Sequence, residues 1–155
     1  MSTINGKVCV VDGVAVDKVF SDGKQVYGRN LVTGTSNELT TATRLGWGGS
    51  PASQASGIYG AGKYYASAYI ENTTPVEMKI YVSVNGHVGN FSSDSIPAGQ
   101  GGIASCTVNI LEGQSLASTW VGFASSQTAS YTYKYKEMMI KRAPSTWTPA
   151  PEDVM

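Results

Sequence analysis

The hydrophobic and polar residues of this chain alternate with a period of two along several segments. The longest alternation follows Pro75, where apolar residues occupy every second position: Val76, Met78, Ile80, Val82 and Val84. The positions between them hold Glu77, Lys79, Tyr81, Ser83 and Asn85. A period of two is the pattern of a β-strand with one buried and one exposed face. We therefore expect the apolar set to be buried between two sheets.

The same alternation recurs elsewhere along the chain. From Lys63 to Glu71, one face carries Tyr64, Ala66, Ala68 and Ile70, and the other carries Tyr65, Ser67, Tyr69 and Glu71. From Ser105 to Leu111, Cys106, Val108 and Ile110 alternate with Ser105, Thr107 and Asn109. Further strands are expected at Arg44–Trp47, Ile58–Tyr59, Thr119–Ala124 and Tyr131–Lys141. With no convincing helical pattern, this set predicts an all-β fold, a β-sandwich or jelly roll.

The two ends of the chain differ from this central region. Asp12-Gly13 and Asp22-Gly23 separate short β-rich runs, and Asp-Gly between such runs is a strong hairpin signal. Residues 1–28 are therefore expected to form a β-hairpin lead-in or linker, and residues 29–143 the jelly-roll module. Residues 144–155 contain three prolines and are expected to be an extended, Pro-rich linker tail.

Charge and length narrow the class of protein. The chain has 155 residues, a usual size for one domain, and a formal net charge of zero. A nucleic-acid partner or a polybasic membrane site would require a basic surface, so neither is expected. No apolar run approaches the roughly 20 residues that span a membrane, and the N-terminus has no secretory signal pattern. Cys9 and Cys106 are expected to be free thiols, with a disulfide between them as the alternative.

Residues that could carry catalysis are few. The single histidine, His87, follows the Asn85-Gly86 turn and is expected to be a surface loop residue. Glu71 and Glu77 flank one turn, and Glu137 is a further acid that a glycosidase could pair, but no pattern singles out two carboxylates. A zinc site, a calcium loop and a phosphate-binding glycine loop lack their usual motifs. We expect no enzyme activity, no cofactor and no metal.

Aromatic residues on the polar faces of the expected strands indicate a binding surface. Tyr65, Tyr69 and Tyr81 lie opposite apolar stripes, and Trp120 faces away from Val121 and Phe123. A flat ring can stack on a sugar, while nearby hydroxyl and amide groups bond its hydroxyls. Aromatic residues also favour strands for packing alone. The hypothesis places six residues on one saccharide-facing surface: Trp47, Tyr65, Tyr69, Tyr81, Asn85 and Trp120.

Both ends of the module resemble a known group of proteins. The segment from Val26 to Ser36, with Tyr27 and Arg29-Asn30-Leu31, and the close at Tyr135–Lys141 and Trp147–Asp153, are similar to tail and baseplate proteins of phages of lactic-acid bacteria. The resemblance implies a carbohydrate-binding module of a distal tail, tail-associated or baseplate accessory protein. It also implies host cell-wall or surface polysaccharide and other tail or baseplate modules as partners, and a place in the virion after assembly in the host cytoplasm. Related modules often hold calcium, but this chain shows no clear acidic cluster for it.

The expected function is non-catalytic binding of saccharide for phage adhesion. One alternative is a structural spacer or decoration domain of a tail protein without a ligand. Another is a glycan-degrading enzyme domain, which would need a pair of carboxylates in a cleft.

Overall fold

The computed structural model describes Val10–Val11, Val14–Ala15, Val19–Ser21, Lys24–Tyr27, Ser53–Gln54, and residues 30–49 and 61–142. Every element in these ranges is a β-strand. Near the N-terminus, β1 (Val10–Val11) pairs with β2 (Val14–Ala15), and β3 (Val19–Ser21) pairs with β4 (Lys24–Tyr27), both antiparallel. The predicted hairpins are therefore confirmed. The boundaries proposed for the module stay predictions, and the Pro-rich tail lies outside the described residues.

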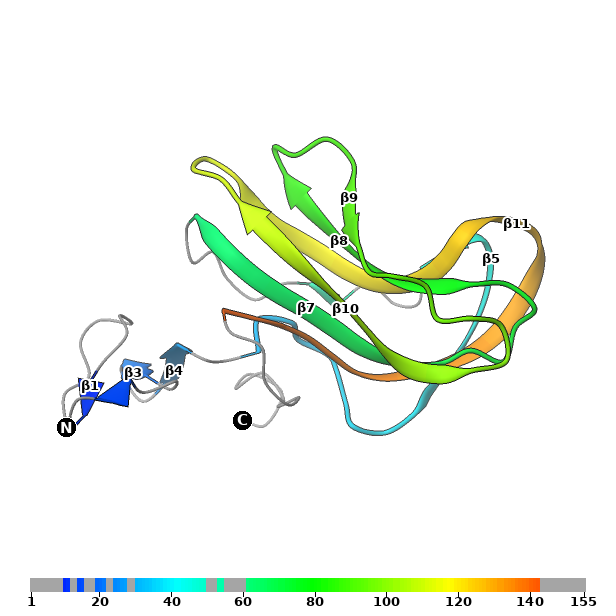
Figure 1. Ribbon diagram of the computed structural model, residues 1–155, viewed down its shortest axis with the longest axis horizontal. Helices are drawn as coiled ribbons and strands as arrows, with labels where there is room; N and C mark the ends of the chain where they lie inside the picture. The colour runs from blue at the N-terminus through cyan, green and yellow to red at the C-terminus, as the bar shows by residue number, and fades with distance from the viewer. Residues whose placement is uncertain are drawn as a thin grey trace.

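The main body is one antiparallel sheet that curls until it is nearly closed (Figure 1). Its central path runs β10 (Gly101–Ile110), β7 (Gly62–Glu71), β11 (Ser115–Lys141), β8 (Met78–Asn85) and β9 (Asn90–Ser92). Two more strands, β5 (Thr40–Gly48) and β6 (Ser53–Gln54), pair with β11. This arrangement confirms the predicted fold class, an all-β jelly-roll β-sandwich after short hairpins.

The strand β11 joins the two layers of the sandwich. Residues Ser115 to Phe123 pair with β8, whereas residues Lys134 to Lys141 pair with β7. Figure 1 shows β11, coloured yellow to orange, leaving the layer of β8 and curving into the layer of β7. The sequence predicted two separate strands, Thr119–Ala124 and Tyr131–Lys141. The structure has one continuous strand instead, so the predicted break between them is wrong. The polar stretch between them remains extended and is continuous with both.

The inner faces of both layers share one hydrophobic core. Tyr64, Ala66, Ala68 and Ile70 of β7 and Met78, Ile80, Val82 and Val84 of β8 are buried in the same cluster as Val121, Phe123 and Tyr133 of β11. The alternation in β7, β8 and β10 therefore predicted the buried faces correctly. Val76 and Cys106 are exceptions, because both are only partly buried, and Val76 also precedes the first residue of β8.

A buried amide fastens the start of the module to its last strand. The Asn30 side chain donates from Nδ2 to the carbonyl of Met138, and its Oδ1 accepts from the backbone N–H groups of Val32 and Ile140. The N–H of Leu31 also donates to the carbonyl of Ile140, at 2.8 Å. The Asn-Leu pair of the recognisable N-terminal motif therefore has a structural role, since it closes the fold against β11.

Other sequence-based expectations met mixed outcomes. The short strand expected at Arg44–Trp47 is the end of the longer β5, and β9 was not anticipated. Cys106 is a free, partly buried thiol. Ile58–Tyr59 and Cys9 lie outside the described residues.

Candidate functional site

The six candidate residues do not form one surface. Tyr65 and Tyr69 lie on β7, whereas Tyr81 and Asn85 lie on β8 and Trp120 lies on the first part of β11. The inner faces of these two layers share one core, so their outer faces point away from each other. The prediction of a single surface is therefore wrong. The candidates are separated because β11 curves from one layer to the other. Its first part pairs with β8 and its last part pairs with β7.

Tyr81 and Trp120 are brought together on the outer face of the layer that contains β8. They are directly opposite in the register of β8 and β11, and their rings stack with centroids 5.6 Å apart and an interplanar angle of 15°. The Tyr81 hydroxyl donates to the carbonyl of Phe123 at 2.6 Å. Burial raises the pKa of this phenol, so it stays protonated and remains a donor. The far end of the Tyr81 ring is therefore fixed.

A glycine makes this arrangement possible. A Cβ atom on Gly122 would lie 3.3 Å from Cε2 of Tyr81, 3.4 Å from Cδ1 of Trp120 and 2.6 Å from the carbonyl oxygen of Trp47. The Tyr81 ring thus passes over Gly122, and the end of β5 approaches β11 at the same point. The Trp47 side chain is 60% exposed, and its backbone lies beside the stacked rings.

Hydroxyl and amide groups continue the same outer face beyond the rings. The hydroxyls of Ser83 and Ser118 are 2.9 Å apart, and Nδ2 of Asn85 donates to the hydroxyl of Ser115 at 3.1 Å. These pairs join β8 to β11, as Tyr81 and Trp120 do. We call the surface formed by Tyr81, Ser83, Asn85, Ser118 and Trp120 the stacked face. It combines aromatic rings with neutral donors and acceptors.

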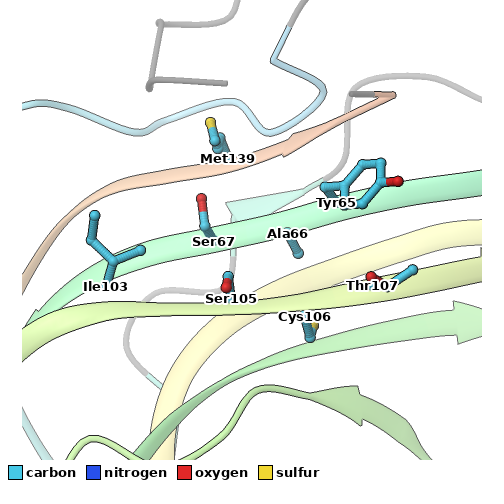
Figure 2. A pocket seen from close by; sticks show the side chains of 8 residues that line it. All are labelled: Tyr65, Ala66, Ser67, Ile103, Ser105, Cys106, Thr107 and Met139. Atoms are coloured by element: carbon cyan, nitrogen blue, oxygen red, sulfur yellow. The ribbon is translucent and has the colours of Figure 1, made fainter. Parts of the chain in front are cut away.

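A groove of about 440 Å³ lies on the opposite layer. Its outward side chains come from three strands, and the register places Ser67 of β7 between Ser105 of β10 and Met139 of β11. Figure 2 shows Ser67 and Ile103 on one side of the strands and Cys106 on the other. The lining residues are Tyr65, Ala66, Ser67, Ile103, Ser105, Cys106, Thr107 and Met139.

Tyr69 is near this groove but has a different environment from Tyr65. The Nζ atom of Lys136 lies 5.4 Å from the centroid of the Tyr69 ring, over its face. Tyr65 instead lines the groove, opposite Thr107 of β10. A cation on a ring face stabilises the pair and occupies the face that a sugar would need. Of the two predicted tyrosines of β7, Tyr65 is therefore the one available to a ligand in the groove.

The residues considered for catalysis are not among those that form the stacked face or line the groove. His87 is exposed, as predicted, and stacks on Phe91 with centroids 4.5 Å apart. Glu77 is exposed, whereas Oε2 of Glu71 is buried without a hydrogen-bond partner. Glu137 has a φ of 57° at a register shift in β11, where its N–H donates to the carbonyl of Ser36.

The described part of the chain shows neither a metal-binding cluster nor a membrane-spanning helix. Within residues 30–49 and 61–142 and the short described strands, no three His, Cys, Asp or Glu side chains gather where they could hold a metal ion. The same part of the chain contains no helix with the length and apolar character needed to cross a membrane.

Several residues of the two surfaces were not anticipated from the sequence. Ser83, Ser118, Ser105, Thr107, Ile103 and Met139 were missed as site residues. The alternation placed Ser83, Ser105 and Thr107 on outward faces, so the sequence alone could have identified them as candidate site residues. Ser118 and Met139 meet their neighbours only through the pairing of β11 with other strands, and the chain pattern does not specify that pairing.

Comparisons with known proteins give one weak likeness. No family model matches the chain, and no curated protein matches it. Among solved structures, it is similar to a crystal structure of the N-terminal CBM22-1–GH10 modules of endo-1,4-β-D-xylanase 10B from Clostridium thermocellum, complexed with xylohexaose. The TM-score is 0.46 at 12% identity, and the likeness covers 79% of this chain but only 28% of the other. None of these comparisons names a phage or tail protein, and the likeness is limited to a weak structural similarity to a protein with a carbohydrate-binding module.

Proposed function

We propose that this chain is a non-catalytic carbohydrate-binding module that attaches a phage tail or baseplate to polysaccharide on the host cell surface. The observation that carries the proposal is the stacked face. There, Tyr81 and Trp120 present adjoining rings on the outside of a sheet, next to a row of neutral hydrogen-bonding groups.

The stacked face has the two kinds of group that a neutral sugar needs. Aromatic rings cover the C–H face of a pyranose, and the serine hydroxyls and the Asn85 amide can exchange hydrogen bonds with its hydroxyls. The Tyr81 ring is already fixed by its bond to the Phe123 carbonyl. A ligand therefore need not immobilise it, which reduces the entropic cost of binding.

The chemistry of this surface supports binding without cleavage. Tyr81, Ser83, Asn85, Ser118 and Trp120 supply rings, hydroxyls and an amide, whereas a glycosidase commonly uses two carboxylates across the scissile bond. We therefore expect no reducing ends on prolonged incubation with wall polysaccharide, and we expect binding to persist in the presence of a chelator.

The phage setting rests on the sequence resemblance at both ends of the module. It gives host wall polysaccharide and neighbouring tail or baseplate modules as partners, and the virion as the location. Binding by one shallow face is expected near millimolar, which corresponds to about 4 kcal/mol. Several copies on a tail would raise the apparent affinity by roughly 10² to 10⁴ through multivalency.

Labelling of intact cells tests this proposal. A fluorescently tagged monomer is expected to label lactic-acid bacteria weakly and reversibly, and a multimerised version firmly, with both competed by free wall saccharide. A spacer domain without a ligand would leave the cells unlabelled in either form. Release of reducing sugar by the purified module would instead favour an enzyme.

A further inference from the structure

The groove on β7, β10 and β11 is a built concavity that the stacked face does not use. Its volume of about 440 Å³ lies within the range of about 300 to 1,000 Å³ that is common for small-molecule sites. Ser67 of β7 and Ser105 of β10 are directly paired, and their small side chains leave space at the centre of the groove. Larger groups, Tyr65, Ile103 and Met139, also line it.

The lining is chemically mixed but uncharged. Ile103 and Met139 are apolar, Tyr65 adds an aromatic ring, and Ser67, Ser105 and Thr107 add hydroxyls. Ile103 is 70% exposed although it is a large apolar residue on a regular strand. Contact with a ligand would remove this apolar surface from water, which is favourable. The nearby Lys136 ammonium already lies over the Tyr69 ring.

We propose that this groove is a second binding site, which takes an uncharged pyranoside independently of the stacked face. The C–H face of the sugar packs on Ile103, Met139 and the Tyr65 ring, and its hydroxyls bond the side chains of Ser67, Ser105 and Thr107. The groove and the stacked face lie on the outer sides of opposite layers, so one module can hold two saccharide segments at once. This extends the proposed function to a second site but does not depend on the first.

Nuclear magnetic resonance of the whole chain can observe the two sites separately. The methyl groups of Ile103 and Met139 report on the groove, the indole N–H of Trp120 reports on the stacked face, and the methyls of buried Ile80 and Met78 serve as internal controls. The probes are the methyl glycosides of glucose, galactose, rhamnose and N-acetylglucosamine, with glucuronic acid as a charged comparison.

Two variants of matched chemistry sharpen the assignment. Ser67→Tyr adds a ring at the centre of the groove, where the small side chain keeps it open. Asn109→Tyr adds the same ring at an exposed position on the outward face of β10, outside the groove lining. Ser67→Tyr is expected to weaken binding in the groove at least about tenfold, equivalent to 1.4 kcal/mol, while Asn109→Tyr leaves it unchanged.

The expected result is a saturable shift of the Ile103 and Met139 methyls with at least one neutral glycoside, lost in Ser67→Tyr and absent with glucuronic acid. If these methyls stay fixed with every neutral glycoside, the second site is overturned, whether or not Trp120 shifts. A preference for glucuronic acid would also overturn it. If the groove methyls shift and Trp120 does not, the second site stands and the stacked face fails as a saccharide site.

Discussion

The Tyr81 and Trp120 rings stack across two neighbouring strands, and the Tyr81 hydroxyl is bonded to the backbone one strand away, at the carbonyl of Phe123. Tyr81→Phe keeps the ring and removes this bond. We expect it to lower the free energy of unfolding by about 0.5 to 1.5 kcal/mol, the usual net value of one hydrogen bond. Urea denaturation measures the change. No loss would show that the bond does not hold the ring in solution.

Adding a side chain at Gly122, beneath these rings, is expected to destabilise the protein. A Cβ at this position would lie 2.6 Å from the carbonyl oxygen of Trp47, which is backbone and cannot rotate away. Gly122→Ala should therefore destabilise the protein by about 1 to 3 kcal/mol, as overpacking does. Gly102→Ala is the matched control, because its Cβ would meet only the Ile96 side chain at 3.4 Å. Equal melting temperatures for the two variants would contradict this account of the close approach.

The core assignment is tested at Ile80, which is fully buried in β8. Ile80→Ala should cost about 2 to 5 kcal/mol, because it leaves a cavity that the two layers cannot close. Val88→Ala, at a position 97% exposed, should change stability by less than about 0.5 kcal/mol. Chemical denaturation of both variants gives the comparison, and similar losses would mean that the faces of β8 are reversed.

The faces of the strands could be predicted from the sequence, but the arrangement of the strands could not. Alternation alone placed Ile80 inside and Tyr81 outside, and it separated Trp120 from Val121 and Phe123. It could not show that Tyr81 pairs with Trp120, because register depends on contacts between distant segments. The sequence also did not predict that β11 is continuous. The polar residues in the middle of this strand resemble a loop between two strands. The five candidates on β7, β8 and β11 were therefore assigned to outward faces correctly, but the six were assigned to one surface wrongly.

The Cys106 thiol gives a pH-dependent prediction. Partial burial raises its pKa from 9.0 to about 11, because the thiolate is poorly solvated there. The unfolded chain loses this proton first, so the contribution to stability is present below pH 9 and is lost as the pH rises toward 11. In a Cys9→Ser background, alkylation by iodoacetamide at pH 8.5 should be much slower in the folded protein than in urea. Equal rates would show that the folded thiol is not shielded.

Binding of wall polysaccharide by the folded Trp120→Ala variant tests the central claim most directly. The variant should lose about 0.5 to 1.5 kcal/mol of stability from the ring pair and remain folded. Leu111→Ala, which removes an exposed apolar side chain from a turn, is the control. In calorimetric titration with polysaccharide from cells that the multimerised module labels, with Ser67→Tyr present in all three proteins so that the groove is closed, the protein with the wild-type stacked face and Leu111→Ala should bind alike. The Trp120→Ala variant should bind at least about tenfold more weakly, a loss of 1.4 kcal/mol or more. Wild-type affinity in the folded Trp120→Ala variant would contradict the assignment of the stacked face as the saccharide-binding surface.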